Sequence, residues 1–597
     1  MIIKVIERRF FMIKMLKNMS KKEVLFAILS ILFMVLQVWL ELKIPDYMSK
    51  ITTIISTENS VSSIIHESVW MILCALGSLV VSIIIGYFSS FVGTSFEKNM
   101  RSKIFRKVQD FGMEEIKKFS TSSLITRDTN DVTQVKNFVV MGTQMLARAP
   151  IMAVMAILKI IGKEWQFSLI TAIGVFIVLS MVSIIVIFAI PKFKKIQKLT
   201  DNLNRITREN LTGIKVVRAY NAEEYEENKF TNANKELTNT HLFVGKIMSL
   251  MNPVMTLVMS SLSLAIYWVG AGLINSAGMM DRIGVFSNMV VFSSYAVQVI
   301  MSFMFLVMLF VIYPRAAVSM GRISEILDTD TNIKDGSISK IKNNITGEVE
   351  FCNVSFKYPD ADEYILENIS FKVNKGETLA IIGGTGSGKS TIVNLIPRFY
   401  DVTSGKVLVD GVNICDMKLE TLHNKLGYVS QKAVLFKGTV LSNLKFGKTD
   451  AKEISKDDAW AALDISQSSS FVKKMEKGLD SDISQGGTNV SGGQKQRISI
   501  ARAITRNPEI YIFDDAFSAL DFKTDYILRK ELNKKYHDTT KIIVASRIGT
   551  IKDADKIIVL DNGKCVGMGK HEELLKNCSV YREIAESQLG EEELKNA

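Results

Sequence analysis

Long apolar runs fill the first half of the chain, and a different pattern begins near residue 346. Each run is close to the roughly 20 apolar residues that an α-helix needs to cross a bilayer. The runs predict an all-α membrane domain of six transmembrane helices over residues 23–314. The predicted spans cover approximately residues 24–44, 69–92, 138–161, 165–190, 247–272 and 285–313.

Two charged residues, Arg148 and Lys159, interrupt the third of these runs. A charge inside a membrane is costly unless its side chain faces protein or water. Arg148 is therefore either packed in the protein interior with a partner or part of a functional pore. The first interpretation is favoured.

The charges between the spans predict the orientation of the chain. Residues 97–137 and 191–246 form long segments rich in Lys and Arg, whereas the turns "GKEW" and "DRIG" are short. Because basic loops stay in the cytoplasm, both long segments, the N-terminus and the second half of the chain are expected there. The apolar spacing of the long segments is helical, so the membrane helices are predicted to continue into the cytoplasm. Residues 1–22 alternate apolar and basic side chains and predict an amphipathic interfacial helix.

From residue 346 the pattern changes to short β-rich runs, "GEVEFCNVSF", "ISFKV" and "TLAIIGG", followed by alternating helices and strands. This alternation predicts an α/β domain with a largely parallel sheet over residues 346–597. Residues 315–345 are expected to form the linker between the two domains.

The amino-acid composition indicates the partners of the chain and the compartment in which it is found. The net charge of +12 is compatible with nucleic-acid binding, but most of the excess Lys and Arg flanks the apolar runs, where the lipid bilayer is the expected partner. No nucleic-acid partner is therefore predicted. The five cysteines have no paired spacing, which favours a reducing compartment without disulfides or a zinc site. The bias toward Lys, Ile and Asn is typical of an AT-rich bacterial source, so a multi-pass protein of the bacterial cell membrane is predicted.

A glycine-rich loop stands between the strand "TLAII" and the helical "IVNLI". This spacing and context match a phosphate-binding loop, in which glycines let backbone amides close around phosphate oxygens. Lys389 supplies a positive charge and Ser390 a hydroxyl ligand for Mg²⁺. A nucleoside triphosphate site is therefore predicted. Its residues are Gly383, Gly384, Thr385, Gly386, Ser387, Gly388, Lys389, Ser390 and Thr391.

The stretch "EIYIFDD" is an apolar strand that ends in two acids, and ligands of parallel sheets bind at that end of a strand. Asp514 is predicted to organise Mg²⁺ at the phosphoryl-transfer site. Asp515 is predicted to point at the attacking water. The alternative is that the two aspartates only cap a helix.

A second anion-binding turn follows the pattern "NVSGGQKQR", where Ser491, Gly492, Gly493 and Gln494 open a basic helix. Free amides at such a turn can hold an anion, although the turn could also be only a helix cap. Because the chain already has a phosphate loop, a second anion site makes sense if it closes on nucleotide held by another copy.

Together these motifs resemble the ATP-binding cassette (ABC) transporters, and the whole chain is similar to an exporter-type half-transporter. The resemblance adds roles that the residues alone do not show. It implies that Tyr358 stacks on adenine, that Gln431 senses and binds Mg²⁺, and that Asp521 lies in a loop that contacts a second cassette. It also implies that two cassettes enclose two ATP molecules, each between one chain's phosphate loop and the other chain's signature "VSGGQ".

Two residues depart from the family pattern at the catalytic position. Asp515 replaces a glutamate, and Ser546 stands where a histidine is expected. Aspartate reaches about 1.5 Å less far than glutamate, and a misplacement of about 1 Å at a reacting centre costs on the order of a hundredfold in rate. The chain's own site is therefore predicted to bind MgATP well and to hydrolyse it slowly.

An altered catalytic position combined with an intact signature resembles the degenerate-site subunit of heterodimeric multidrug exporters. This resemblance implies a non-identical partner half-transporter that carries the glutamate and the histidine. The resemblance implies ATP-driven export, and the predicted substrate is small and amphipathic or hydrophobic. Methionines and phenylalanines in the membrane runs can line an adaptable cavity, or they can face lipid and pack against neighbouring helices. An active homodimer, a lipid flippase and a regulatory or nucleotide-gated membrane subunit without active transport are the alternatives.

Overall fold

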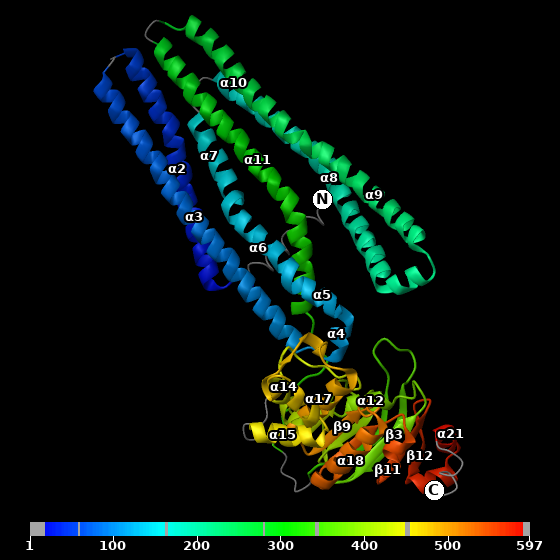
Figure 1. Ribbon diagram of the computed structural model, residues 1–597. Helices are drawn as coiled ribbons and strands as arrows, with labels where there is room; N and C mark the ends of the chain where they lie inside the picture. Colours follow the sequence, from blue (N-terminus) through cyan, green and yellow to red (C-terminus); the bar gives the residue numbers. More distant parts are fainter. Residues whose placement is uncertain are drawn as a thin grey trace. The chain divides into compact units, whose positions relative to one another are not determined.

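The computed structural model describes residues 18–57, 60–160, 165–278, 281–340, 346–447 and 454–588. They form two compact units (Figure 1). The membrane unit comprises Met1–Gln109 and Ser120–Thr329, and the ATPase unit comprises Asp110–Phe119 and Asp330–Ala597. The predicted amphipathic helix over residues 1–22 lies outside the described residues as far as residue 17.

Helices are the only regular secondary structure in the described residues of the membrane unit. Its helices are α2 (Lys21–Thr57), α3 (Val61–Gln109), α5 (Thr121–Thr126), η1 (Arg127–Asp131), α6 (Val132–Met141), η2 (Gly142–Leu146), α7 (Arg148–Ile160), α8 (Trp165–Ala219), α9 (Glu223–Ser249), α10 (Met251–Ser276) and α11 (Arg282–Leu327). The predicted helical membrane domain followed by an α/β ATPase domain is thereby confirmed.

Apolar composition within these helices agrees with the predicted spans. Among the described residues, five helical stretches are long and apolar enough to cross a membrane, and a shorter apolar stretch covers Trp165–Met181 at the start of α8. The helices α3 and α8 contain 49 and 55 residues, so each is about 75–85 Å long at 1.5 Å per residue. They extend well beyond a hydrocarbon core of about 30 Å, as predicted.

Two charged residues of this unit, Glu23 and Arg148, have polar partners. Glu23 is fully buried at the start of α2, and its Oε1 accepts hydrogen bonds from Ser95 Oγ at 2.7 Å and Asn99 Nδ2 at 2.5 Å. Arg148 Nη2 lies 2.8 Å from Glu41 Oε2. Arg148 therefore has the interior partner that the cost of a charge in the membrane demands.

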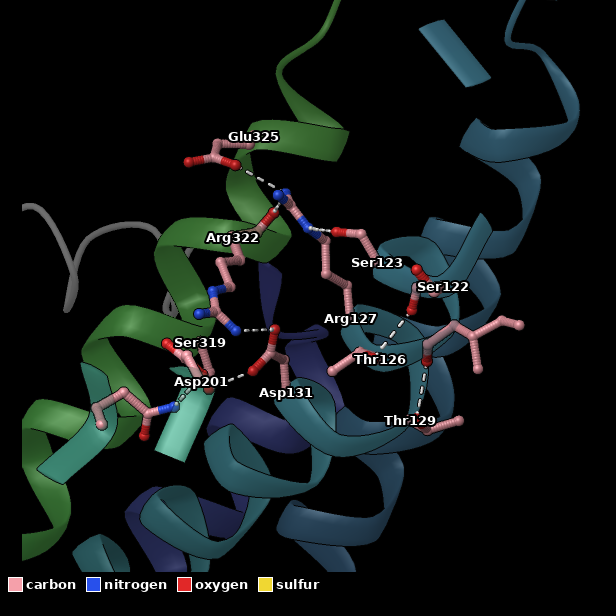
Figure 2. A network of polar contacts seen from close by, with 12 residues as sticks. Ser122, Ser123, Thr126, Arg127, Thr129, Asp131, Asp201, Ser319, Arg322 and Glu325 are labelled. Atoms are coloured by element: carbon pink, nitrogen blue, oxygen red, sulfur yellow. Dashed lines mark hydrogen bonds and ion pairs between the residues drawn. The ribbon is translucent and has the colours of Figure 1, made fainter. Parts of the chain in front are cut away.

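Two π-helical turns, η1 and η2, interrupt the helix that leads into α7. A π-turn contains one extra residue, which redirects the side chains that follow. Figure 2 shows the polar network around η1, where Asp131 is buried and accepts a hydrogen bond from Ser319 Oγ at 2.7 Å. Arg127 Nη1, from the same turn, lies 2.8 Å from Glu325 Oε2. These contacts join η1 to the last part of α11.

The last helix also changes the predicted linker. Residues 315–345 were expected to be a linker, but α11 continues as far as Leu327. Its buried apolar positions there are Ala316, Met320, Ile323 and Ile326. This spacing places one apolar face of the helix against the rest of the membrane unit. Burial of that face stabilises the helical conformation beyond the predicted start of the linker.

The ATPase unit is built on a six-stranded sheet with the order β12-β11-β3-β10-β9-β6. Its strands are β3 (Thr378–Gly383), β6 (Leu426–Val429), β9 (Ile510–Asp514), β10 (Thr540–Val544), β11 (Lys556–Asp561) and β12 (Lys564–Gly569), and all pairs except β11 with β12 are parallel. Along β9, Tyr511 and Phe513 join one apolar core, and Ile510 and Ile512 join the other. Both faces of the sheet are therefore covered, which explains its continuous apolar strands.

A second sheet and a set of helices complete the unit. The antiparallel sheet has the order β2-β1-β4-β5, with β1 (Val349–Phe356), β2 (Leu366–Val373), β4 (Ser404–Val409) and β5 (Val412–Asn413), and β7 (Gly438–Thr439) pairs with β8 (Asp482–Ile483). The helices are α12 (Lys389–Leu395), α13 (Leu419–Asn424), α14 (Val440–Leu444), α15 (Lys456–Ile465), α16 (Ser469–Lys474), η3 (Gly478–Asp480), η4 (Gln485–Gly487), α17 (Gly492–Thr505), α18 (Phe522–Lys535), α19 (Ile548–Ile551), α20 (His571–Asn577) and α21 (Ser579–Gln588).

One short helix from the membrane half of the sequence belongs to the ATPase unit. The helix α4 (Met113–Phe119) lies in the first long segment between predicted spans, yet it groups with the residues after Asp330. Glu115 Oε1 accepts a hydrogen bond from the Asn332 backbone amide at 3.0 Å, and Glu114 Oε2 accepts one from Asn332 Nδ2 at 2.6 Å. These two bonds hold α4 to the chain that leads into β1.

We expect the Asp131→Ala substitution to destabilise the membrane unit by about 1–3 kcal/mol, because it leaves the buried Ser319 hydroxyl without its acceptor. Thermal unfolding of the full chain in detergent measures the effect. The matched control is Thr126→Val, which removes an exposed hydroxyl bonded to the Ser122 carbonyl in the same network. Equal unfolding temperatures for the two variants would contradict this account of the η1 contacts.

Candidate nucleotide-binding site

The glycine-rich loop connects the end of β3 to α12. Gly388 has a φ of 96°, a left-handed conformation that favours glycine. A side chain at Gly383 would bring its Cβ to 2.1 Å from the Leu560 carbonyl oxygen, so only glycine fits there. Lys389 Nζ donates to the carbonyls of Gly383 at 2.8 Å and Gly384 at 2.6 Å. The Lys389 side chain thus folds back over the phosphate loop.

The loop contains a polar atom that the protein does not satisfy. Ser387 is buried, and its Oγ has no hydrogen-bond partner among the described residues. Buried polar atoms normally have partners, so an unsatisfied hydroxyl inside a phosphate-type loop fits a missing oxygen-rich ligand.

The acids predicted to organise Mg²⁺ lie beside this loop. Ser390 Oγ donates to Asp514 Oδ1 at 2.8 Å. Burial raises the pKa of Asp514, with the nearby Asp515 carboxylate adding to the effect, and burial also lowers the pKa of Lys389. A hydroxyl and a carboxylate in contact form an oxygen donor set of the kind that Mg²⁺ prefers. The residues present therefore fit a bound Mg²⁺–triphosphate.

The three residues predicted to carry the chemistry meet at one edge of the sheet. Asp515 follows β9, Gln431 follows β6 and Ser546 follows β10, and these strands are neighbours. Gln431 Nε2 donates to Asp515 Oδ2 at 3.3 Å, and Ser546 Oγ donates to Asp515 Oδ1 at 3.4 Å. Asp515 has a φ of 48°, which its short polar side chain tolerates better than most residues do.

The aromatic residue expected to stack on adenine lies close to the same loop. The Tyr358 hydroxyl is 3.2 Å from Thr391 Oγ1. Its ring packs edge-on against Tyr400 and Phe356, with centroids 5.3 Å and 4.9 Å away. Lys117 Nζ, from α4, lies 5.8 Å from the centre of the Tyr358 ring. Tyr358 is therefore held at the rim of the site by its own neighbours.

The signature turn forms a separate feature. Ser491 is the N-cap of α17 and exchanges hydrogen bonds with Gln494, while Gly492 and Gly493 form the first turn. Within the described part of the chain, no hydrogen bond connects this turn to the phosphate loop. Asp521 is the N-cap of α18, where its Oδ1 accepts a hydrogen bond from the Thr524 backbone amide, and hydrogen bonding to Thr524 lowers the pKa of Asp521. Both helix caps are formed, and Ser491 and Gly492 of the signature turn are exposed.

Three positioning residues were missed by the sequence analysis. Gln496 is buried and donates through Nε2 to the Ser430 carbonyl at 3.2 Å, which ties the signature helix to the residue before Gln431. Gln588 Nε2 donates to the Ser546 carbonyl at 2.8 Å. The third is Arg502, which lies inside a stretch interpreted only as basic.

Arg502 joins the signature helix to the segment that follows Gln431. It donates to the carbonyls of Asn443 at 2.8 Å and Val434 at 3.0 Å, and its guanidinium lies over the rings of Phe436 and Phe446. Burial lowers its pKa to about 10. The regular apolar spacing of α17 was the available signal, since it places Arg502 on a face that includes buried Ile498.

Comparisons with known proteins agree with this fold. Residues 27–303 match the family model of the ABC transporter transmembrane region, and residues 366–518 match the ABC transporter family model. The chain is 40% identical to an uncharacterized ABC transporter ATP-binding protein of Mycobacterium tuberculosis over 87% of both proteins. It is 31% identical to an ATP-dependent lipid A-core flippase of Aliivibrio fischeri over 85% of both. A bacterial Atm1-family ABC exporter with ATP bound has the same fold, with a TM-score of 0.79 over 96% of this chain and 99% of the other at 24% identity.

The chain therefore belongs to the ABC transporters, and its architecture is that of an ABC exporter. Membership implies ATP binding and transport-coupled ATP hydrolysis in a membrane-embedded protein. The resemblance expressed by the sequence motifs is confirmed at this level.

We expect Ser390→Ala to weaken ATP binding by about tenfold in the presence of Mg²⁺, because it removes one oxygen ligand and the hydrogen bond to Asp514. Binding of ATP in excess chelator should change little, since the loop amides and Lys389 remain. Titration of the full chain with a fluorescent ATP analogue, with and without Mg²⁺, measures both values. An equal loss under both conditions would show that Ser390 supports the loop rather than the metal.

Proposed function

We propose that the chain is one half of an ATP-driven exporter and that its own phosphate loop belongs to a slow ATP site. The observation that carries the proposal is the identity and setting of Asp515. Its carboxylate lies between Gln431 and Ser546 at the end of β9, where the resembling exporters have a glutamate. The side chain is about 1.5 Å shorter than glutamate. A loss of reach on that scale at the attacking water costs on the order of a hundredfold in rate.

Ser546 weakens the same site for a second reason. A serine hydroxyl is neutral, short and unable to take up a proton near neutral pH, whereas an imidazole can donate to phosphate and carry charge. The hydroxyl is already directed at Asp515, and Gln588 holds the backbone of the loop. Both departures therefore act on one reacting centre.

Nucleotide binding does not depend on these two residues. The loop amides, Lys389 and Tyr358 would hold ATP, and Ser390, Asp514 and Gln431 would hold Mg²⁺. When bound, Mg²⁺ neutralises charge on the phosphates. A site with strong binding groups and a weak water-activating group would stay occupied and hold the cassettes together between cycles.

The signature turn is the reason for proposing a non-identical partner. Ser491, Gly492 and Gly493 form a capped turn, exposed at Ser491 and Gly492, that is fit to close on nucleotide held by another chain. A partner that carries the glutamate and histidine would hydrolyse that nucleotide at a normal rate. The assembly proposed is therefore a heterodimer in the bacterial cell membrane, with the ATPase unit in the cytoplasm.

The cargo proposed is a small amphipathic or hydrophobic molecule. A lipid flippase is the second candidate, since two relatives at 31% and 29% identity are ATP-dependent lipid A-core flippases. Movement of a soluble amphipathic substrate, rather than of a lipid between leaflets, would separate the two functions in reconstituted vesicles.

Restoring both departures should restore the chemistry. We expect Asp515→Glu with Ser546→His to raise ATP turnover of the chain alone on the order of a hundredfold. The glutamate must adopt the left-handed backbone of Asp515, so unfolding temperature is measured as well. The control Asp515→Asn should leave the low turnover of the parent nearly unchanged. Rapid turnover by the parent that Asp515→Asn abolishes would instead identify an active homodimer.

Pairing tests the assembly directly. ATP turnover and bound nucleotide are measured for the purified chain in lipid, alone and mixed with a candidate partner half-transporter. The proposal predicts low turnover with retained ATP for the chain alone and a rise on pairing. Fast turnover by the chain alone would refute the slow site.

A further inference from the structure

The membrane unit contains a second polar site, centred on the ion pair of Glu41 and Arg148. Glu41 belongs to α2 and Arg148 begins α7, directly after the π-turn η2. Arg148 Nη2 donates to Glu41 Oε1 at 2.9 Å and to Oε2 at 2.8 Å. Both residues lie within predicted spans, where ionisable groups are rare and mark functional sites.

The two partners of this pair are not equally satisfied. Glu41 Oε1 also accepts from Gln37 Nε2 at 3.0 Å and from Ser78 Oγ at 3.4 Å. Arg148 uses a single nitrogen, and within the described residues its Nε and Nη1 donate to no acceptor. A guanidinium has five N–H donors, so most of the donors of Arg148 remain available. The unused hydrogen-bonding groups of the ion pair are therefore mainly donors, and a ligand with acceptor atoms would complement them.

Arg148 also lines a cavity. The cavity has a volume of about 360 Å³ and lies among α2, α7 and α11. The Arg148 side chain is 34% exposed. Apolar walls come from Ile44, Met152, Val297 and Met301. Sites for small organic molecules have this size and this mixture of apolar walls with a few polar groups.

A second polar group in the wall also lacks a partner. Gln298 lines the cavity, and its Oε1 is buried without a hydrogen-bond partner among the described residues. Polarizable methionines suit an apolar portion of variable shape.

We propose that this cavity binds an acidic amphiphile, with its carboxylate or phosphate on the free N–H groups of Arg148 and its apolar portion against Met152 and Met301. The inference rests on the proposed export function only in identifying this molecule as cargo. Glu41 is a positioning residue, because it orients the guanidinium and balances its charge when the cavity has no ligand.

The chain offers a matched control in a second ion pair between the same two helices. Lys159 Nζ lies 2.6 Å from Asp46 Oδ2, and the Tyr295 hydroxyl donates to Asp46 Oδ1 at 2.5 Å. Neither Asp46 nor Lys159 lines the cavity. A variant of this pair removes the same charges from α2 and α7 without touching the proposed site.

The test measures binding to the full chain in phosphatidylcholine nanodiscs without nucleotide. The probes are dansyl-undecanoic acid and its methyl ester, which share a chain and differ in the charge. We expect the acid to bind more tightly than the ester. The double variant Glu41→Gln with Arg148→Gln should lower the affinity for the acid by about 10-fold to 100-fold, the range for charged hydrogen bonds, and leave the affinity for the ester unchanged. The double variant Asp46→Asn with Lys159→Gln should leave both affinities unchanged.

Competition identifies the source of the acidic group. Displacement of the probe by phosphatidic acid added to the nanodisc indicates a lipid phosphate, and displacement by dodecanoate indicates a carboxylate. Inorganic phosphate should not compete, because it lacks the apolar portion. Equal binding of acid and ester, an equal loss in both double variants, or displacement by inorganic phosphate would overturn the proposal.

The result is independent of the slow ATP site, since no nucleotide is present. Acid binding that depends on Arg148 together with fast ATP turnover by the chain alone would refute the heterodimer and retain the cavity. Low ATP turnover by the chain alone, together with equal binding of acid and ester, would refute the proposed cavity site and retain the heterodimer.

Discussion

The nucleotide site depends on the hydrogen-bonded register of four parallel strands. Val544 of β10 pairs with Asp514 of β9 and with Ile381 of β3. Because these strands run in the same direction, their carboxyl ends share one edge, and the residues that leave them converge there. A slip of one residue in a strand would turn its side chains to the opposite face. The relative positions of the phosphate loop, the acids and the residues around Asp515 are therefore fixed by the hydrogen-bond register between these strands.

The same physical rule about buried polar groups governs both units. Glu23 and Glu41 persist in an apolar setting because each carboxylate accepts several hydrogen bonds. In the ATPase unit, Asp514 persists beside Ser390 although burial raises its pKa. Among the described residues, eight buried side-chain atoms lack a hydrogen-bond partner, and two of them belong to residues at the proposed sites, Ser387 Oγ in the phosphate loop and Gln298 Oε1 beside the cavity.

Local motifs were the most predictable part of the site. The phosphate loop follows from spacing because its conformation is set by glycines within the loop itself. Contacts between distant segments were not predictable, since a single sequence does not show which faces meet. The bond from Gln588 to the Ser546 loop and the position of Arg502 between two phenylalanine rings are examples. Arg148 was expected to have a partner, but nothing in the apolar run of α2 singled out Glu41.

The sequence by itself determined the class of protein, the two kinds of domain and the chemical groups of the nucleotide site. Periodicity, composition and glycine spacing are properties of residues close together in the chain, so they can be recognised without knowledge of the tertiary structure. Only the tertiary structure decided that α4 belongs with the ATPase unit, that α11 runs on to Leu327, and that Arg148 pairs with Glu41 beside a cavity. These outcomes depend on which surfaces pack together, and packing is settled by the burial of apolar faces and the pairing of polar groups far apart in the chain.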